Sequence, residues 1–497
     1  MTFSPTPQQD AVDRALALTS DNLLVTARAG TGKTTTMVWL IHQILRRHPG
    51  ARVLAMAFNR VIADELQARL PRCVEARTFH SLCSSACRRA AGAQPSDQKM
   101  QEIIAHWVGQ MDACEITRGQ VVKETRPLIG LVYATRTDPD DEEAVTQMAA
   151  DYDQDLEQPA LTLPLLANVI RTARSLTKAV SYDCMIDHVL VHDYPVPTYD
   201  YVFVDEAQDL NRAFLHIVEK TVKNTGRLIA VADEFQAIYQ FRGADHRSVQ
   251  VIRERFNCTT LPLSVTFRCA TAIVEKARQL VPDYEAAPTN PEGVVDERDA
   301  DYCTDTLREV PPGTLLLCRT NAPLIRWCMW CIRHGIQAYV RGRDIGKELT
   351  RLLEQADRGK SLDDTLINLR ARAQRKAARL RSQDRERAAE ALMDKVQSVE
   401  EIADAYDTVE QVLRRIGSAY RDKGTGLQFS TVHKAKGLEA DTAVILHPEL
   451  MPPRWIYRYR QDDPERFERL LREEQNIRYV ALTRARNRLI LQECPRD

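Results

Sequence analysis

The stretch Leu23–Thr36, which reads LLVTARAGTGKTTT, predicts a strand, a glycine-bearing loop and a helix in close succession. Its apolar start ends at the loop, and apolar residues recur at helical spacing after Lys33. Glycines within the loop let the backbone wrap a phosphate chain with its N–H groups pointing inward. Lys33 can reach the β- and γ-phosphates from a positively polarised helix end, and the Thr34 hydroxyl can ligate Mg²⁺. We therefore predict a nucleoside triphosphate site in this loop.

Composition sets only broad limits on the rest of the chain. The 497 residues are 44% hydrophobic and 28% charged, as in ordinary globular proteins, and are enough for about three or four domains. The net charge is −1, so a nucleic-acid partner needs a local cluster of basic residues. No run of eighteen apolar residues occurs, and the N-terminus does not resemble a secretory leader. We expect no membrane segment and a cytoplasmic location, with nucleoid association if the chain is prokaryotic or phage-encoded.

Twelve cysteines raise the question of a metal site. Two close pairs occur, Cys83/Cys87 and Cys328/Cys331, but neither is followed by Cys or His at zinc-finger spacing. The spacing of Cys328 and Cys331 is more simply explained by the buried face of a helix. We expect reduced, buried thiols.

Three further apolar runs predict strands that belong with the loop: Arg52–Phe58, Tyr201–Val204 and Arg227–Ala232. The second ends in Asp205-Glu206, where one carboxylate can hold Mg²⁺ and the next can orient and deprotonate an attacking water. Gln236, just past the third strand, can hydrogen-bond a γ-phosphate.

An aromatic and basic run follows that glutamine and includes Tyr239, Phe241 and Arg242. These side chains could stack on the bases of a nucleic acid strand and contact its phosphates. Ordinary core packing explains the two aromatic residues equally well.

The remaining chain divides into helical and mixed regions. A helix after Phe58 is expected to place Val61, Ile62, Leu66 and Leu70 on one face, and residues 83–198 read as helices without obvious strands. A second α/β unit follows, with strands expected at Thr314–Cys318, Ile336–Val340, Leu427–Thr431, Ala443–Leu446 and Leu489–Leu491.

Within the second unit, Leu349–Tyr420 is helical and heavily charged, with an arginine-rich run between residues 370 and 387. Such runs are usually solvated faces, and contact with a phosphate backbone is the alternative interpretation.

Taken in order and nearly end to end, these motifs resemble the UvrD/Rep/PcrA family of superfamily 1 DNA helicases. Alanine at position 27, where the general loop pattern has glycine, is usual in that family. Three details, FNRVIADEL, SVTFR and VHKAKGLE, resemble its short branch of F-box DNA helicases and phage or prokaryotic relatives. Ala232 and Thr266 depart from the usual glycine and asparagine. The resembling stretches are Gln8, Ala27–Thr34, Ala57–Asn59, Thr78–Ser81, Asp205–Asp209, Asp233–Ala244, Phe267–Arg268, Thr431–Glu439 and Val480–Ala485.

The resemblance implies an α/β fold of two RecA-like P-loop NTPase domains with parallel sheets, each interrupted by a largely helical insertion, the second one short. The first domain is expected at 1–82 and 199–258, around an insertion at 83–198. The second is expected at 259–345 and 426–497, around a charged insertion at 346–425. No nuclease domain is expected after the last motif.

The resemblance also implies that ATP and Mg²⁺ are cofactors and assigns roles to individual residues. Catalytic roles fall to Lys33, Glu206, Gln236 and two arginine fingers, Arg268 and Arg484. Metal ligands are expected at Thr34 and Asp205. Nucleotide contacts are expected from Gln8 at the adenine edge, Phe267 over adenine, Glu439 at the ribose, and Ala29, Gly30, Thr31, Gly32, Lys33, Thr34, Thr35, Arg268 and Arg484. DNA contacts are expected from Phe58, Asn59, Thr78, His80, Tyr239, Phe241, Arg242 and His433.

The expected function is an ATP-dependent single-strand DNA translocase and helicase, with 3′-to-5′ movement implied by the resemblance alone. Both α/β units supply parts of the ATP site, so ATP is expected to draw them together and hydrolysis to release them. Expected partners are single-stranded DNA and tailed or junction duplexes, with a protein partner possible through residues 346–425. Three alternatives stay open: a protein-stripping translocase without robust unwinding, the helicase subunit of a repair or defence complex, and a non-enzymatic binding subunit. The last is disfavoured because every ATPase position is filled.

Overall fold

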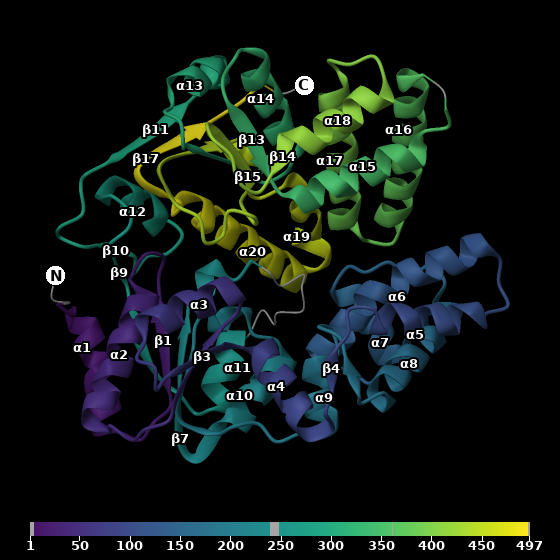
Figure 1. Cartoon of the computed structure of the whole chain (residues 1–497). Helices are drawn as coiled ribbons and strands as arrows, with labels where there is room; N and C mark the ends of the chain where they lie inside the picture. The colour runs from purple at the N-terminus through teal and green to yellow at the C-terminus, as the bar shows by residue number, and fades with distance from the viewer. Residues whose placement is uncertain (1–3, 239–247, 360, 496–497) are drawn as a thin grey trace. The chain divides into compact units, whose positions relative to one another are not determined.

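The computed structural model describes residues 4–238, 248–359 and 361–495. The chain forms two compact units (Figure 1). The first comprises Met1–Ala27 and Gly32–Leu263, and the second comprises Arg28–Thr31 and Ser264–Asp497. Most of the expected phosphate-binding loop thus groups with the second unit, although the strand before it and the helix after it belong to the first.

The sheet of the first unit holds six parallel strands in the order β3-β2-β6-β7-β1-β8. They are β1 (Leu23–Ala27), β2 (Val53–Ala57), β3 (Glu75–Thr78), β6 (Tyr199–Val204), β7 (Val222–Ala232) and β8 (Thr259–Leu263). The four strands expected from the apolar runs are confirmed. Because β8 pairs with β1, the expected start of the second domain at residue 259 is too early.

Side chains of β1 alternate between two cores, as the period of two in a strand requires. Leu23 and Val25 pack in one core with α1 (Pro7–Leu18), α2 (Lys33–Arg47) and α3 (Arg60–Arg69). Leu24 joins the other core, which includes residues of α10 (Arg212–Thr221) and α11 (Ser248–Arg255). Burial on both faces explains why the central strands of this parallel sheet read as continuous apolar runs.

The prediction of the apolar face of α3 is wrong at one position. Ala63, Leu66 and Leu70 are buried and Ile62 is partly buried, but 76% of Val61 is exposed. Residues 63, 66 and 70 follow one stripe of the helix, and Val61 lies outside it.

Helices dominate the segment between β3 and β6, as expected. They are α4 (Phe79–Ala91), α5 (Lys99–Gly109), α6 (Glu115–Thr135), α7 (Glu142–Asp151), α8 (Pro159–Ser175) and α9 (Met185–Val191). Two short strands, β4 (Gln94–Pro95) and β5 (Ala179–Val180), pair within the segment, so it is not free of strands. The expected boundary between residues 82 and 83 falls inside α4.

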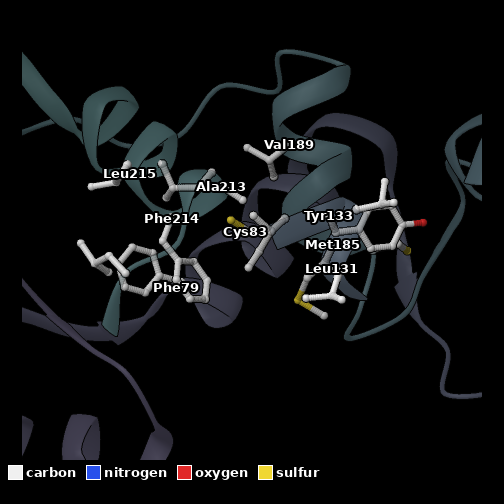
Figure 2. Close-up of a cluster of buried hydrophobic side chains, with 14 of the residues drawn as sticks. Phe79, Cys83, Leu131, Tyr133, Met185, Val189, Ala213, Phe214 and Leu215 are labelled. Atoms are coloured by element: carbon white, nitrogen blue, oxygen red, sulfur yellow. The ribbon is translucent and has the colours of Figure 1, made fainter. Parts of the chain in front are cut away.

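One continuous core joins these helices to the sheet. Figure 2 shows the part of this core to which α4, α6, α9 and α10 contribute. Phe79 at the start of α4 stacks on Phe214 of α10, with ring centroids 4.3 Å apart. Cys83 of α4 lies in the same cluster as Leu131 of α6 and Met185 of α9. The helix that follows β3 is therefore fixed by residues from the whole helical segment.

The second unit is built on seven parallel strands in the order β11-β17-β16-β12-β15-β13-β14. Their bounds are β11 (Val294–Arg298), β12 (Leu315–Cys318), β13 (Ala338–Arg341), β14 (Tyr420–Arg421), β15 (Leu427–Thr431), β16 (Ala440–Leu446) and β17 (Ala485–Gln492). The five expected strands are confirmed, and β11 and β14 are additional. A separate parallel pair is formed by β9 (Val265–Thr266) and β10 (Glu285–Ala286).

Helices of the second unit include the expected charged segment. They are α12 (Thr271–Arg278), α13 (Cys303–Glu309), α14 (Ala322–Arg333), α15 (Arg343–Ala356), α16 (Leu362–Ser382), α17 (Glu386–Ala403), α18 (Val409–Ala419), α19 (Tyr459–Asp462) and α20 (Pro464–Leu482). Residues of α15 to α18 share one core with β12, β13 and β15. This segment begins at Arg343, before the expected boundary at 346, and packs as part of the second unit.

Arginines of α16 are engaged by groups of their own unit. Arg370 Nε lies 2.8 Å from Glu400 Oε1, and Arg381 Nε lies 2.9 Å from Glu386 Oε1. These ion pairs agree with a solvated face on which the charges compensate one another. Contact of the arginine-rich run with a phosphate backbone stays a prediction.

The four cysteines singled out in the sequence, Cys83, Cys87, Cys328 and Cys331, are buried as expected. Across the described ranges, no helix has the length and apolar character needed to cross a bilayer.

Gly426, in the turn before β15, provides a test of the packing in the second unit. It has a φ of +92°, and an added Cβ would lie 2.0 Å from the Gln337 carbonyl oxygen. Gly313 has a similar φ of +88° but open space around it. Gly313→Ala should cost only the left-handed backbone penalty of about 1–2 kcal/mol. Gly426→Ala should cost clearly more, measured as the fall in the denaturation midpoint, and equal losses would contradict this packing.

Candidate nucleotide site and nucleic-acid interface

The carboxyl ends of parallel strands meet at one edge of a sheet, and ligands of open α/β sheets bind there. In the first unit, Lys33 and Thr34 lie at the start of α2, one loop after β1. Asp205 and Glu206 follow β6, and Gln236 lies just past β7. The structure thus brings together five of the residues expected to act on a triphosphate.

Lys33 is the cation of this cluster. Its ammonium lies 3.0 Å from Glu206 Oε1, and 11% of the side chain is exposed. Burial alone would lower the pKa of Lys33, but the carboxylates of Glu206, Asp233 and Asp205 outweigh it and raise that pKa. Among the described residues, Nζ has this ion pair but no aligned hydrogen-bond acceptor. A largely buried ammonium with one close carboxylate oxygen fits the additional oxygens of a bound triphosphate.

Asp205 and Thr34, the two expected Mg²⁺ ligands, lie within hydrogen-bond distance of each other. Thr34 Oγ1 donates to Asp205 Oδ2 at 3.2 Å, and the Glu206 N–H donates to Asp205 Oδ1 at 2.9 Å. Burial, followed by the charge of Glu206, raises the pKa of Asp205 to about 6. One carboxylate and one hydroxyl fit Mg²⁺, which takes few protein ligands and completes its shell with substrate phosphates and water.

Gln208 was not singled out from the sequence, although it lies within the same motif. Its side-chain amide donates to Glu206 Oε2, and its Oε1 accepts from the Asp233 N–H at 2.9 Å. It therefore ties the residue expected to activate water to the end of the neighbouring strand. Glu206 itself has a left-handed φ of 52°, which turns the chain sharply after β6.

Gln236, the expected γ-phosphate sensor, is 6% exposed. Its amide nitrogen donates to Asp233 Oδ2 at 2.5 Å. The side chain is thus oriented by the strand-end carboxylate beside Lys33.

Neighbouring residues of α1 and α2 hold this region in place. Gln9 donates to Thr36 Oγ1 at 2.7 Å and completes the N-terminal cap of α1 with Thr6. Gln8, the expected adenine contact, is half-buried in the first turn of α1. Thr35 accepts from Arg69 at 3.1 Å. Nucleotide contacts by Gln8 and Thr35 stay predictions.

The loop between β1 and α2 has the backbone that its glycines permit. Gly30 and Gly32 have left-handed φ values of 72° and 76°. A Cβ on Gly30 would lie 2.4 Å from Arg268 Cβ, so only glycine fits there without rearrangement. Thr31 Oγ1 donates to the Arg28 carbonyl at 2.9 Å and closes the turn.

Residues 28–31 bond to other residues of the second unit. The Ala29 N–H donates to Tyr479 Oη and its carbonyl accepts from Tyr284 Oη, both at 2.9 Å. The Phe267 N–H donates to the Gly30 carbonyl at 2.9 Å. The Phe267 ring, expected over adenine, is 50% exposed.

The two expected fingers lie together in the second unit but in different environments. Arg484 is 1% exposed and donates to the Val480 and Leu438 carbonyls at 2.9 and 3.0 Å. Burial, and then the charge of Arg268, lowers the pKa of Arg484 to about 10. Arg268 Nε lies 2.6 Å from Oε2 of Glu439, the expected ribose contact.

An aromatic pocket of about 400 Å³ lies in the first unit. Phe58, just after β2, and His80, in the first turn of α4, line it together with Phe214. His80 stacks on Tyr182 with centroids 3.8 Å apart and planes 6° apart. Burial lowers the pKa of His80 to about 4, so the ring is neutral near pH 7. Stacked neutral rings beside an exposed phenylalanine suit unpaired bases.

Tyr182 is a pocket residue that the sequence analysis missed. It is 61% exposed and precedes α9, within the segment interpreted only as a helical insertion. No local motif marked it, because a single tyrosine between helices has no distinctive spacing.

Other expected DNA contacts have structural roles that do not test DNA binding. Asn59 and Thr78 cap α3 and α4 by accepting from the Ile62 and Ser81 N–H groups. His433 follows β15 in the second unit. Tyr239, Phe241 and Arg242 lie outside the described residues.

Parallel sheets, a glycine loop before a helix and strand-end carboxylates define the class of P-loop α/β proteins. A family model described as an AAA domain matches residues 8–242. A second, described as the UvrD-like helicase C-terminal domain, matches residues 199–495. The second match covers more than half of the chain, which therefore belongs to the UvrD-like helicase family.

Curated relatives agree with that family. The chain is 24% identical over 297 residues to the ATP-dependent DNA helicase PcrA of Staphylococcus aureus strain Mu50. It is 25% identical over 295 residues to PcrA of Staphylococcus epidermidis. Each match covers 54% of this chain and 39% of the relative, so the similarity spans about two fifths of those proteins.

The raised pKa of Asp205 gives a pH-dependent prediction. The folded protein binds this proton more tightly than the unfolded chain, so ionised Asp205 costs folding free energy above about pH 6. Asp205→Asn should stabilise the nucleotide-free protein by about 1–3 kcal/mol at pH 7.5 and lose Mg²⁺-dependent nucleotide binding. The gain should shrink between pH 6 and 4, where the wild type takes up the proton. Asp64→Asn, at a residue with 73% side-chain exposure, is the control. A gain independent of pH would contradict the assignment.

Proposed function

We propose that the chain is an ATP-dependent single-strand DNA translocase and helicase. The observation that carries the proposal is the sheet edge of the first unit. The cluster of Lys33, Asp205 and Glu206 follows two of its strands, and the pocket with Phe58 and His80 follows two others. The family match and the PcrA relatives, named as ATP-dependent DNA helicases, support this choice.

The residues of the first unit divide the chemistry of ATP hydrolysis among them. Lys33 contacts the β- and γ-phosphates as a point charge, and Thr34 with Asp205 would hold Mg²⁺. The metal would supply charge neutralisation at the phosphates. Glu206, oriented by Gln208, positions the attacking water and accepts its proton, and the backbone of residues 29–35 wraps the phosphates.

Residues of the second unit complete the proposed nucleotide site. Arg268 and Arg484 act as fingers, because guanidinium groups form charge-assisted bonds to phosphate oxygens. Phe267 covers adenine, Gln8 reads its edge and Glu439 contacts the ribose. Gln236 hydrogen-bonds the γ-phosphate and couples its presence to the DNA-binding residues.

DNA is proposed to lie across the aromatic pocket of the first unit. Phe58, His80 and Tyr182 offer ring faces that accept any base, so binding is independent of sequence. Asn59, Thr78 and His433 contribute polar contacts to the strand. Tyr239, Phe241 and Arg242 are proposed contacts from sequence resemblance alone.

Several finer features of the proposal rest on motif resemblance. They are 3′-to-5′ movement, membership of the short F-box-helicase and phage branch, and tailed or junction duplexes as substrates. A cytoplasmic, nucleoid-associated location and a protein partner on residues 346–425 belong to the same proposal.

A translocase that strips proteins without robust unwinding is the second candidate. The observation that favours it is that α15 to α18 pack into the core of the second unit, so this short segment is part of the motor itself. Strand displacement on 3′- and 5′-tailed duplexes separates the two. Displacement of the 3′-tailed duplex supports the helicase, and ATP turnover without displacement of either substrate supports the translocase.

Single-stranded DNA should stimulate ATP turnover by the purified chain if the proposal is correct. Glu206→Gln should lower that turnover by roughly 10²–10⁴-fold, because the water is held but no longer deprotonated, while ATP still binds. Glu143→Gln, at an exposed residue of α7, is the matched control and should behave as wild type. Turnover that ignores DNA, or survives in Glu206→Gln, would contradict the proposal.

A further inference from the structure

Glu439 is shared by two arginines. Its Oε2 lies 2.6 Å from Arg268 Nε, and its Oε1 accepts from Arg486 Nη2. The side chains of Arg268, Glu439 and Arg486 are 24%, 33% and 46% exposed, so the network lies near solvent and can rearrange. Each arginine thus bonds a different oxygen of the same carboxylate.

The strand register fixes this arrangement. Ala440 of β16 pairs with Ala485 of β17, so Glu439 and Arg484 occupy neighbouring positions just before the two strands. Arg486 lies two residues further along than Arg484, and its Nη1 is 3.7 Å from Asp441 Oδ1. The Ala270 N–H donates to the Arg486 carbonyl at 2.8 Å, which holds the turn carrying Arg268 beside β17.

The two proposed fingers differ in what they must give up to reach a phosphate. Arg484 is buried against main-chain carbonyls, whereas Arg268 is held by a carboxylate of opposite charge. Arg268 can bond a phosphate through Nε only after it leaves Glu439. The strength of its hold on Glu439 therefore affects triphosphate binding.

Arg486 weakens that hold in two ways. While Arg486 bonds Oε1, Arg268 pairs with Oε2 and not with both oxygens in the stronger, bidentate geometry of an arginine and a carboxylate. When Arg268 leaves, Arg486 remains as the counter-ion of Glu439, so the carboxylate is not left without a positive partner.

We propose that Arg486 is a positioning residue that shares Glu439 with Arg268 and so lets Arg268 transfer to the γ-phosphate of a bound triphosphate. This inference rests on the proposed function, because it needs Arg268 to contact that phosphate. Arg486 acts through Glu439 and does not itself touch the nucleotide.

The test is the ratio of two equilibrium affinities, measured by calorimetry with Mg²⁺ on the full chain. Binding of the β,γ-imido analogue of ATP is compared with binding of ADP, which has no γ-phosphate. A contact between Glu439 and ribose is common to both nucleotides and cancels in the ratio. Loss of folding would lower both affinities and is visible in the melting temperature.

Arg486→Met should lower the preference for the analogue over ADP by about two- to five-fold, the range expected for a partly exposed ion pair. Glu439→Gln should raise the preference, because Arg268 is released. The double variant should match Glu439→Gln, since Arg486 has no effect once the carboxylate is gone. Arg486→Lys should restore part of the preference.

Arg488→Met is the matched control. Arg488 lies on the same strand and also bonds two carboxylates, those of Asp296 and Glu309, but has no bond to Glu439. Its ratio should equal that of the wild type.

Three results would overturn the inference. An unchanged ratio in Arg486→Met would show that Arg486 does not influence Arg268. Equal effects of Arg486→Met with and without Glu439→Gln would show that it does not act through Glu439. Failure of the wild type to bind either nucleotide would refute the proposed function itself, and the inference with it.

Discussion

Parallel pairing of every strand in the first sheet is the constraint on which the rest of the structure depends. It places the ends of β1, β2, β3, β6 and β7 at one edge, so residues far apart in the chain become neighbours. Lys33 meets Asp205 and Glu206 there only because β1 and β6 run in the same direction. Phe58 and His80 reach the same edge from β2 and β3. One antiparallel strand would send its functional residues to the opposite edge.

The second organising feature is that the cations expected to contact a triphosphate are paired with carboxylates of the chain itself. In the first unit the Lys33 ammonium is compensated by strand-end carboxylates, and in the second unit Arg268 is compensated by Glu439. In the proposed function a triphosphate would compete with these internal partners, because it offers several charged oxygens to each cation. The energy of binding is thereby linked to rearrangement of side chains that already have partners. If the cations exchange carboxylate partners for phosphate oxygens, nucleotide binding and hydrolysis can switch the same residues between two arrangements.

The sequence predicted the central parts of both units because they carry strong patterns. Strands buried on both faces read as apolar runs, and the loop at residues 27–34 has a distinctive spacing of glycine, lysine and threonine. Edge strands escaped, since β8 reads TTLPL and β11 reads VVDER, and half-exposed strands need no apolar run. Val61 was misplaced because neighbouring apolar residues fit more than one helical stripe. Tyr182 depends on tertiary contacts that no local spacing encodes. Gln208 lies inside a recognised motif, but its bond to the Asp233 N–H joins residues 25 positions apart and is made only in the folded chain.

The central claim is that the nucleotide cluster and the aromatic pocket of the first unit are coupled, so that DNA bound at the pocket stimulates ATP turnover at the cluster. It is tested most directly by the DNA concentration that half-maximally stimulates ATP turnover in a Phe58→Ala/Tyr182→Ala variant, with Ile116→Ala, at an 86% exposed residue of α6, as control. The account predicts that this concentration rises about tenfold or more in the double variant, because base stacking is lost, and stays at the wild-type value in the control. Wild-type stimulation in the double variant would contradict the claim that the pocket binds the DNA that drives turnover.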